Sequence, residues 1–426
     1  MKAPKFSKEF FISRRRELLE RLPENSVAFV VSADDLPRNG DQAFVFRQNS
    51  DLYYLTGVEQ EQTILVLCPS HPQEKFREVL FIRRSSPELE TWIGHKLTKE
   101  EAREISGIQT IYWFDEFETY LAEFMYYSQD VFISVNENMK YQRFYNDAEY
   151  RFIERLRFLY PLHTYKRLGL FLVPMRLRKT AEELEVIKYA IELTGKAFLR
   201  VLRFIRPGVY EYQVEAEIIH EFVSNGVRSV AYQSIIASGE NANVLHYIYN
   251  NKVCEDGDML LMDFGSEYLN YAADLTRTVP VNGKFSSRQA EVYDAVYMVQ
   301  RYMIEEFIRP GLTINQINEE ADRQIADRLV DLGLIKESEK HVRDRVKAYY
   351  PHGLSHFMGL DVHDVGTKDT PLDEGMIITV EPGIYIKEEG LGVRLENDVL
   401  ITDHGTKDLM NKIPLERQVI EDLMSK

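Results

Sequence analysis

Short apolar runs alternate with longer amphipathic segments over the first part of the chain. The runs Val27–Val31, Thr63–Cys68 and Val79–Ile82 are rich in β-branched residues and bounded by polar turns, a pattern typical of buried strands. The segments 99–105 and 146–159 instead have the spacing of helices. Strands that alternate with helices over this length predict an α/β domain.

The pattern changes shortly after residue 170, where a basic segment leads into a long amphipathic stretch. Thr180 and Glu183 form a capping box, and apolar residues then recur with helical spacing over 181–205. We therefore predict a domain boundary near residue 170. The N-terminal α/β domain spans residues 1–170, and the C-terminal domain spans residues 171–426.

The C-terminal domain mixes helices with strands that can form antiparallel hairpins. We expect further helices at residues 211–223, 287–308 and 314–332, and strands at residues 230–236, 259–264, 271–279, 376–381 and 392–401. This mixture predicts the α+β class for the chain.

Composition and charge narrow the function classes. The chain has 426 residues, 44% hydrophobic content and a formal net charge of −16. The negative charge argues against nucleic acid as a partner, and we interpret Arg14–Arg16 as the solvated face of a helix. No apolar run has the length of a membrane span, and the charged N-terminus is not a secretory signal. Cys68 and Cys254 are too few for a disulfide framework, so we expect a cytoplasmic protein.

Four carboxylates and one histidine in the C-terminal domain stand in short apolar or β-prone runs. They are Asp263, Asp274, His356, Glu381 and Glu396. An acid in such a run costs free energy unless something cationic meets it, and four carboxylates balance two divalent cations. Each residue alone is more simply a surface residue or an ion-pair partner. Together they favour a hydrolase with two metal ions.

Asp263 and Asp274 lie in neighbouring strand-like runs and are an odd number of positions apart. If these runs form a hairpin that turns at Tyr268–Leu269, the two acids are directly opposed, with Cβ atoms about 4.5–5.5 Å apart. Two like charges at this distance repel each other in an empty protein and favour a bound cation. This hairpin therefore predicts one carboxylate pair of a metal site.

Glu381 and Glu396 repeat the arrangement around a turn-like segment at Lys387–Gly390. They are again directly opposed, unless Pro382-Gly383 inserts a bulge that shifts the register. Two such pairs can bracket two metal ions. Oxygen ligands with one imidazole suit Mn²⁺, with Co²⁺, Fe²⁺ or Zn²⁺ as the other candidates.

Three of the ten histidines, His352, His356 and His363, lie within one glycine-containing segment. Their spacing does not decide which of them binds metal. A cluster of imidazoles nevertheless indicates a functional site, because histidine suits both metal binding and proton transfer near neutral pH. His246 follows a polar loop, and taken alone it is more simply an ordinary surface or core residue.

Longer motifs surround these residues in both domains. They are Gly239-Glu240-Asn241, Leu245-His246-Tyr247, Met262-Asp263-Phe264-Gly265, Ala273-Asp274, Pro351–Asp364, Val380-Glu381-Pro382-Gly383-Ile384-Tyr385, Gly392–Asp398 and, in the N-terminal domain, Arg47–Gly57. With these motifs the chain resembles aminopeptidase P of the pita-bread metallopeptidase superfamily over nearly its whole length. The resemblance implies a C-terminal pita-bread (creatinase/aminopeptidase) domain and an N-terminal creatinase-like α/β domain.

The resemblance also implies roles for individual residues. The metal ligands would be Asp263, Asp274, His356, Glu381 and Glu396, with Asp274 and Glu396 bridging two ions. Glu381 would also take the proton of the attacking water. The remaining roles fall to His246 and His363, which would stabilise the tetrahedral intermediate or assist the leaving nitrogen, and to His352, Arg394 and Tyr385, which would line the proline pocket.

The implied function is a metal-dependent aminopeptidase that releases the N-terminal residue from peptides with proline in second position. A hydroxide that bridges two metal ions, Mn²⁺ by preference, would attack the peptide bond. The resemblance further implies a homodimer or homotetramer. Two alternatives use the same fold: prolidase, which cleaves Xaa-Pro dipeptides, and metal-free pita-bread proteins such as binding modules, which have lost ligands that this chain retains.

Overall fold

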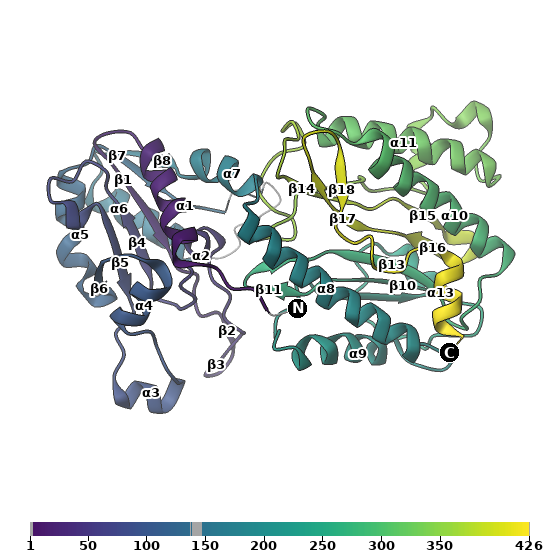
Figure 1. Cartoon of the computed structure of the whole chain (residues 1–426), viewed down its shortest axis with the longest axis horizontal. Coiled ribbons are helices and arrows are strands. Elements are labelled where there is room, and N and C mark those ends of the chain that lie inside the picture. Colours follow the sequence, from purple (N-terminus) through teal and green to yellow (C-terminus); the bar gives the residue numbers. More distant parts are fainter. Residues whose placement is uncertain (1–2, 137, 139–146, 426) are drawn as a thin grey trace. The chain divides into compact units, whose positions relative to one another are not determined.

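The computed structural model describes residues 3–136, 138 and 147–425 (Figure 1). The chain divides into two compact units, one formed by Lys5–Met175 and the other by the chain from Arg176 onwards together with Pro4. In the described part of the chain, no helix combines the length and the apolar character needed to cross a membrane.

A six-stranded sheet organises the N-terminal unit. Its strand order is β6-β5-β4-β1-β7-β8. The strands are β1 (Ser26–Val31), β4 (Ile64–Leu67), β5 (Glu78–Ile82), β6 (Thr110–Trp113), β7 (Asp130–Ile133) and β8 (Thr164–Arg167). Strand β1 pairs antiparallel with β4 and parallel with β7, and all of its residues are buried. Both faces of the central strand are therefore covered, and the three predicted strands are confirmed.

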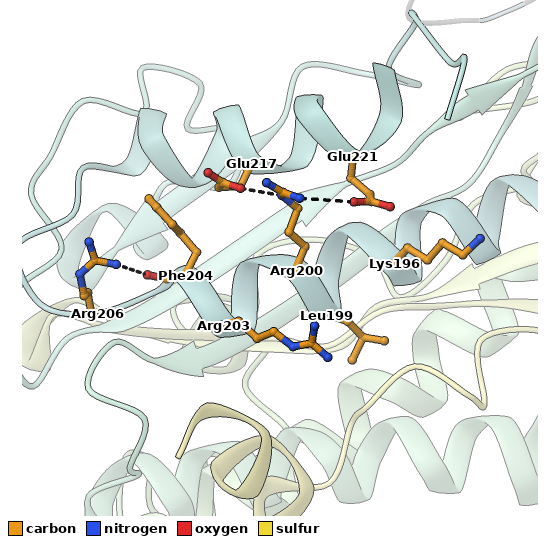
Figure 2. Close-up of a pocket in the computed structure, with 8 residues that line it drawn as sticks. All are labelled: Lys196, Leu199, Arg200, Arg203, Phe204, Arg206, Glu217 and Glu221. Atoms are coloured by element: carbon orange, nitrogen blue, oxygen red, sulfur yellow. Dashed lines mark hydrogen bonds and ion pairs between the residues drawn. The ribbon is translucent and has the colours of Figure 1, made fainter. Parts of the chain in front are cut away.

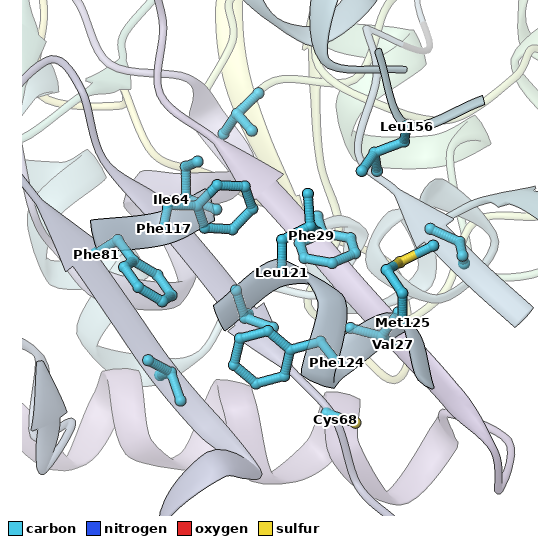
Figure 3. Packing of buried hydrophobic residues seen from close by; sticks show 14 of the residues in the cluster. Val27, Phe29, Ile64, Cys68, Phe81, Phe117, Leu121, Phe124, Met125 and Leu156 are labelled. Carbon is cyan, nitrogen blue, oxygen red and sulfur yellow. The ribbon is translucent and has the colours of Figure 1, made fainter. Parts of the chain in front are cut away.

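Helices accompany this sheet. They are α1 (Lys8–Arg21), α2 (Ser50–Thr56), α3 (Pro87–Ile93), α4 (Lys99–Ser106), α5 (Phe117–Tyr126), α6 (Ala148–Leu159) and α7 (Gly169–Leu177), of which α3 buries none of its residues and projects away from the sheet (Figure 1). Figure 3 shows Phe117, Leu121 and Phe124 of α5 packed with Phe29 and Phe81 of the sheet in one buried cluster. The helix predicted from residue 99 is confirmed. The helix predicted over 146–159 is present as α6 from Ala148 onwards; residue 146 itself lies outside the described residues.

Arg15 contradicts the interpretation of Arg14–Arg16 as a solvated face. Its side chain is 1% exposed and forms an ion pair with Glu78. Its guanidinium also donates to Leu55 O at 2.6 Å and to Ser106 O at 2.8 Å. Arg15 and Leu18 are three positions apart and share one face of α1, and both are buried. This face of the helix is therefore turned inward.

The four helices predicted for the C-terminal unit are confirmed as α8 (Ala181–Phe204), α9 (Glu211–Ser224), α10 (Ser287–Tyr302) and α11 (Ile314–Asp331). Two further helices, α12 (Arg343–Lys347) and α13 (Arg417–Met424), were not predicted. The capping box of α8 is present, since Thr180 N–H donates to Glu183 at 2.8 Å and Glu183 N–H donates to Thr180 Oγ1 at 3.3 Å. The predicted helix over 287–308 ends as a π-helical segment at Met303–Phe307.

Short antiparallel strands complete this unit. One sheet has the order β13-β10-β9 and another has the order β14-β17-β18, and two further pairs are β11-β12 and β15-β16. The strands are β9 (Ile235–Ser238), β10 (Met259–Phe264), β11 (Glu267–Tyr268), β12 (Tyr271–Ala272), β13 (Leu275–Pro280), β14 (Ile377–Val380), β15 (Gly383–Ile386), β16 (Leu391–Arg394), β17 (Asn397–Ile401) and β18 (Thr406–Asp408). The strand predicted at 392–401 is therefore two strands.

The first predicted hairpin exists, but its register differs from the prediction. Asp263 pairs with Thr276, so Asp274 lies two positions away, diagonally rather than directly opposite. The turn falls at Leu269 and Asn270, which both have positive φ angles of 48° and 63°. A turn with two left-handed residues needs Asn or Gly at one of them, and this favours Asn270 over Tyr268 as a turn residue.

The second hairpin has the predicted register. Gly383 pairs with Arg394 in β15 and β16, and Val380 pairs with Asn397 in β14 and β17. Because both pairs follow one register, no bulge intervenes and Glu381 stands opposite Glu396. The expected turn is closed by Gly390, whose φ of 59° lies in the left-handed region that favours glycine.

Candidate metal centre

The predicted metal ligands lie where short strands are interrupted. Asp274 stands between β12 and β13, Glu381 between β14 and β15, and Glu396 between β16 and β17. Asp263 belongs to the end of β10, and His356 lies in a loop that the bridge Phe357–Ile378 fixes to the sheet. A break between paired strands frees a carboxylate from the regular alternation of the sheet while its neighbours remain anchored.

The structure brings these side chains together. One ligand atom each from Asp274, His356 and Glu396 can be chosen so that all three lie within 4.8 Å of one another. Glu381 Oε1 lies 3.8 Å from His356 Nε2, and Asp274 Oδ2 lies 3.4 Å from the same nitrogen. These atoms form one group of candidate ligands.

His356 presents the ring nitrogen that a metal ion needs. Its Nδ1 lies 3.1 Å from Phe357 O, and a proton there would be donated to this carbonyl. The other nitrogen, Nε2, then offers a lone pair toward the carboxylates. Burial lowers the pKa of His356, but the hydrogen bond to Asp274 and the charges of Glu381 and Asp274 raise it above its ordinary value.

The carboxylates repel one another in a buried setting. Burial raises the pKa of Glu381 to about 8, and the charges of Asp274 and Asp263 add to the rise while His356 and Arg394 oppose it. Burial, followed by the charges of Asp274, Glu381 and Asp263, raises the pKa of Glu396 well above its ordinary value. Bound cations would relieve this repulsion, so the donor set fits divalent ions.

Asp263 joins the group through two neighbours. Tyr232, whose hydroxyl is 2.6 Å from Asp263 Oδ1, also contacts Asp274 Oδ1. Arg394 Nη2 donates to Asp263 Oδ2 at 2.6 Å. Burial raises the pKa of Asp263, an effect that Arg394 opposes and Asp274 reinforces. The sequence analysis missed Tyr232 as a site residue and placed it in a strand over 230–236, but the strand begins only at Ile235, so that prediction was wrong and Tyr232 lies in an irregular segment.

Thr276 is a second residue that the sequence analysis missed. Its hydroxyl donates to Glu396 Oε2 at 2.7 Å and accepts a hydrogen bond from Arg394 Nε at 3.2 Å. Its position directly opposite Asp263 in β13 could have revealed it, had the register of the first hairpin been known.

The predicted pocket residues Arg394, Tyr385 and His352 form a chain of hydrogen bonds. Arg394 Nη1 donates to the Tyr385 hydroxyl at 2.9 Å, and this oxygen lies 2.8 Å from His352 Nε2. His352 Nδ1 lies 2.8 Å from Gly353 O, so it donates there and Nε2 accepts from Tyr385. Burial and the charge of Arg394 lower the pKa of His352 to about 3, which keeps its ring neutral.

The two remaining predicted residues, His363 and His246, are exposed and lie near the group. The ring of His363 stands edge-on to the ring of His356, with centroids 4.3 Å apart. A charge on His246 contributes to the low pKa of His352. The two imidazoles therefore lie within electrostatic range of each other.

A separate surface hollow of about 510 Å³ lies along α8 and α9 (Figure 2). Arg200 forms ion pairs there with Glu217 at 2.6 Å and Glu221 at 3.8 Å. The Arg203 side chain points away from this ion-pair group in Figure 2, and Arg206 donates to Phe204 O. This hollow contains none of the predicted site residues, and its cations do not converge on one point.

Comparison with known proteins agrees with this geometry. Residues 185–403 match the metallopeptidase family M24, and residues 11–134 match the N-terminal domain of aminopeptidase P. The chain is 36% identical over 435 residues to the Xaa-Pro aminopeptidase of Haemophilus influenzae, covering 99% of this chain and 98% of that protein. The Xaa-Pro aminopeptidase of Escherichia coli is 35% identical over 437 residues, with 98% of each chain covered. The structure of Escherichia coli aminopeptidase P with the inhibitor Pro-Leu matches with a TM-score of 0.89, at 34% identity and 99% coverage of both chains.

Proposed function

Because the chain belongs to the metallopeptidase family M24 and carries the N-terminal domain of aminopeptidase P, it is an Xaa-Pro aminopeptidase, and we propose which residues perform the hydrolysis. The predicted pita-bread domain and the α/β domain before it are confirmed by the same comparisons. The enzyme uses divalent metal ions and acts on peptides, which it cleaves after a first residue that precedes proline.

The proposed ligands of two ions are Asp263, Asp274, His356, Glu381 and Glu396. The observation that carries this proposal is the convergence of Asp274, His356 and Glu396 within 4.8 Å. The oxygen-rich donor set with one imidazole favours Mn²⁺, with Co²⁺, Fe²⁺ or Zn²⁺ as the other candidates. Two bound ions supply a nucleophile at neutral pH and polarise the scissile carbonyl.

Glu381 is proposed as the general base. Its carboxylate lies among the candidate ligands, with Oε1 3.8 Å from His356 Nε2, so a water held by the ions would lie within its reach. A carboxylate in this position can accept the proton of the attacking water and pass it on. When the bond breaks, the proline nitrogen leaves as a secondary amine and needs one proton, which Glu381 can return to it.

His363 and His246 are proposed to stabilise the tetrahedral intermediate or to assist the departing nitrogen. Both imidazoles are exposed, and His363 stands against the ligand His356. His352, Tyr385 and Arg394 are proposed to line the proline pocket. The low pKa of His352 makes its ring a neutral wall for the proline ring rather than a proton donor.

We further propose a homodimer or homotetramer that works in the cytoplasm. Large apolar side chains of the N-terminal unit, including Trp92 at 82%, Phe158 at 84% and Leu162 at 89% exposure, support contacts with another subunit. The free thiols of Cys68 and Cys254 agree with a reducing compartment.

The variant Glu381→Gln tests the proposed base. With metal content measured in parallel, we expect the kcat on an Xaa-Pro-Yaa tripeptide to fall by about 10²–10⁴-fold. The matched control is Glu388→Gln, an exposed acid in the same hairpin, which should keep normal activity. Activity of Glu381→Gln equal to that of the control would overturn the assignment.

A further inference from the structure

A group of four charged side chains, three of them buried, lies beside the loop that carries His363. We call this group the clamp; it consists of Arg176, Lys179, Asp361 and Asp364. Arg176 Nη2 lies 2.8 Å from Asp361 Oδ2 and 2.5 Å from Asp364 Oδ1. Lys179 Nζ lies 3.1 Å from Asp364 Oδ2 and donates to Arg176 O at 2.8 Å.

The clamp is balanced in charge and mostly removed from water. The side chains of Lys179 and Asp364 are each 1% exposed and that of Arg176 is 5% exposed, whereas Asp361 is 43% exposed. Buried charges of this kind are tolerated only with partners in fixed geometry, because removing one partner leaves an uncompensated charge. The clamp therefore fixes both aspartates relative to the segment Arg176–Lys179 that leads into α8.

Backbone contacts close the same loop. Asp364 N–H donates to Phe357 O at 2.9 Å, and Gly359 N–H donates to Asp361 O at 3.1 Å. A Cβ atom on Gly359 would lie 2.2 Å from Asp364 Oδ2 and 2.7 Å from Lys179 Nζ. A side chain at this position would displace both ends of the buried ion pair, so glycine leaves the clamp undisturbed.

His363 lies between the two clamped aspartates, and its ring stands 4.3 Å from the ring of the ligand His356. We infer that Arg176 and Lys179 are positioning residues, which act through Asp361 and Asp364 to hold His363 against the metal centre during the reaction. This inference rests on the proposed role of His363. It goes further by assigning a function to two buried cations that do not touch the substrate.

A double-mutant cycle in the metal-loaded, full-length enzyme tests the inference. The variants Arg176→Lys and Asp361→Asn each loosen the clamp, and the second removes only a half-exposed charge, so its fold should survive. We expect each to lower the kcat on an Xaa-Pro-Yaa tripeptide about tenfold, with KM changed less than about twofold. In a His363→Ala background, the same changes should lower kcat by less than about twofold, because they act through that side chain.

The exposed ion pair of Arg178 and Asp373 provides the matched control, since it belongs to the same segment. Arg178→Lys and Asp373→Asn should leave kcat unchanged in both backgrounds. Equal losses for the clamp variants with and without His363, or no loss at all, would overturn the inference. Full kcat in His363→Ala alone would instead remove the proposed role of His363, and the inference with it.

Discussion

Removing the metal ions should make the stability of the protein depend on pH through Glu381. In the folded, metal-free protein this carboxyl keeps its proton up to a pKa of about 8, whereas in the unfolded chain it loses the proton near the ordinary value of 4.5. The folded state then binds more protons across this window. The stability that Glu381 contributes is fully present at low pH and is lost as the pH rises toward 8.

The size of the effect follows from the two pKa values of Glu381. Each pH unit between them costs about 1.36 kcal/mol, so raising the pH from about 5 to about 8 removes about 4 kcal/mol. In a unit of this size, one kcal/mol moves the melting temperature by about 2–4 °C. The expected fall of Tm from this residue is therefore about 8–16 °C.

Thermal unfolding of the wild type and of Glu381→Gln in a chelator measures this contribution. The amide of Glu381→Gln cannot titrate. The Tm of the wild type, measured relative to that of the variant, should therefore fall by about 8–16 °C between about pH 5 and about pH 8. Saturating Mn²⁺ should remove the slope in the wild type, because the bound ions hold Glu381 in its charged form. If the Tm values of the two metal-free proteins changed with pH to the same extent, Glu381 would not make this contribution.

Three further changes have defined expected results. Tyr232→Phe removes a hydroxyl that contacts Asp263 and Asp274, so Mn²⁺ affinity measured by calorimetry should fall about 10–100-fold; unchanged affinity would contradict this role. Arg394→Met leaves the buried Asp263 without its cation, so metal-free stability measured by urea unfolding should fall by about 3–5 kcal/mol, and a loss below about 1 kcal/mol would be inconsistent with the ion pair. Gly265→Ala places a Cβ atom 1.7 Å from Ala273 O, so kcat/KM and Tm should both fall, and an unaltered enzyme would disprove the close approach.

Matched substitutions elsewhere in the chain control for these changes. Tyr249→Phe alters an exposed tyrosine, and Gly405→Ala adds a Cβ atom where nothing lies within 4 Å. Both should leave metal affinity, stability and activity unchanged.

The most predictable features were those set by local chemistry. The bounds of β10 and the capping box before α8 follow from short patterns, and the register of the second hairpin follows from a turn that ends in Gly390. Glycine in the left-handed region closes the turn at Lys387–Gly390, and counting outward from the turn centre at Glu388–Glu389 places Glu381 opposite Glu396.

Features set by tertiary contacts were harder to predict. The first hairpin turns at Leu269 and Asn270, and leucine gives no hint of a positive φ angle, so the predicted register was wrong. The burial of Arg15 depends on carbonyl groups of Leu55 and Ser106, which are remote in sequence. Tyr232 reaches the carboxylates from an irregular segment for the same reason.

The candidate ligands were recognisable as residue types, because acids in apolar runs require a compensating charge. Their breaks in strand pairing were not recognisable, since the sequence around Leu395 and Glu396 reads as one continuous strand. The structure divides that strand, and this division frees Glu396 to face the other ligands.

The most direct test of the account is the release of the first amino acid by the Mn²⁺-loaded enzyme from an Xaa-Pro-Yaa tripeptide and from the matching Xaa-Pro dipeptide. We expect faster cleavage of the tripeptide, since an aminopeptidase must accept residues beyond proline. Cleavage of the dipeptide alone would identify a prolidase with a closed pocket. No cleavage of either peptide with metal bound would contradict the assigned substrate.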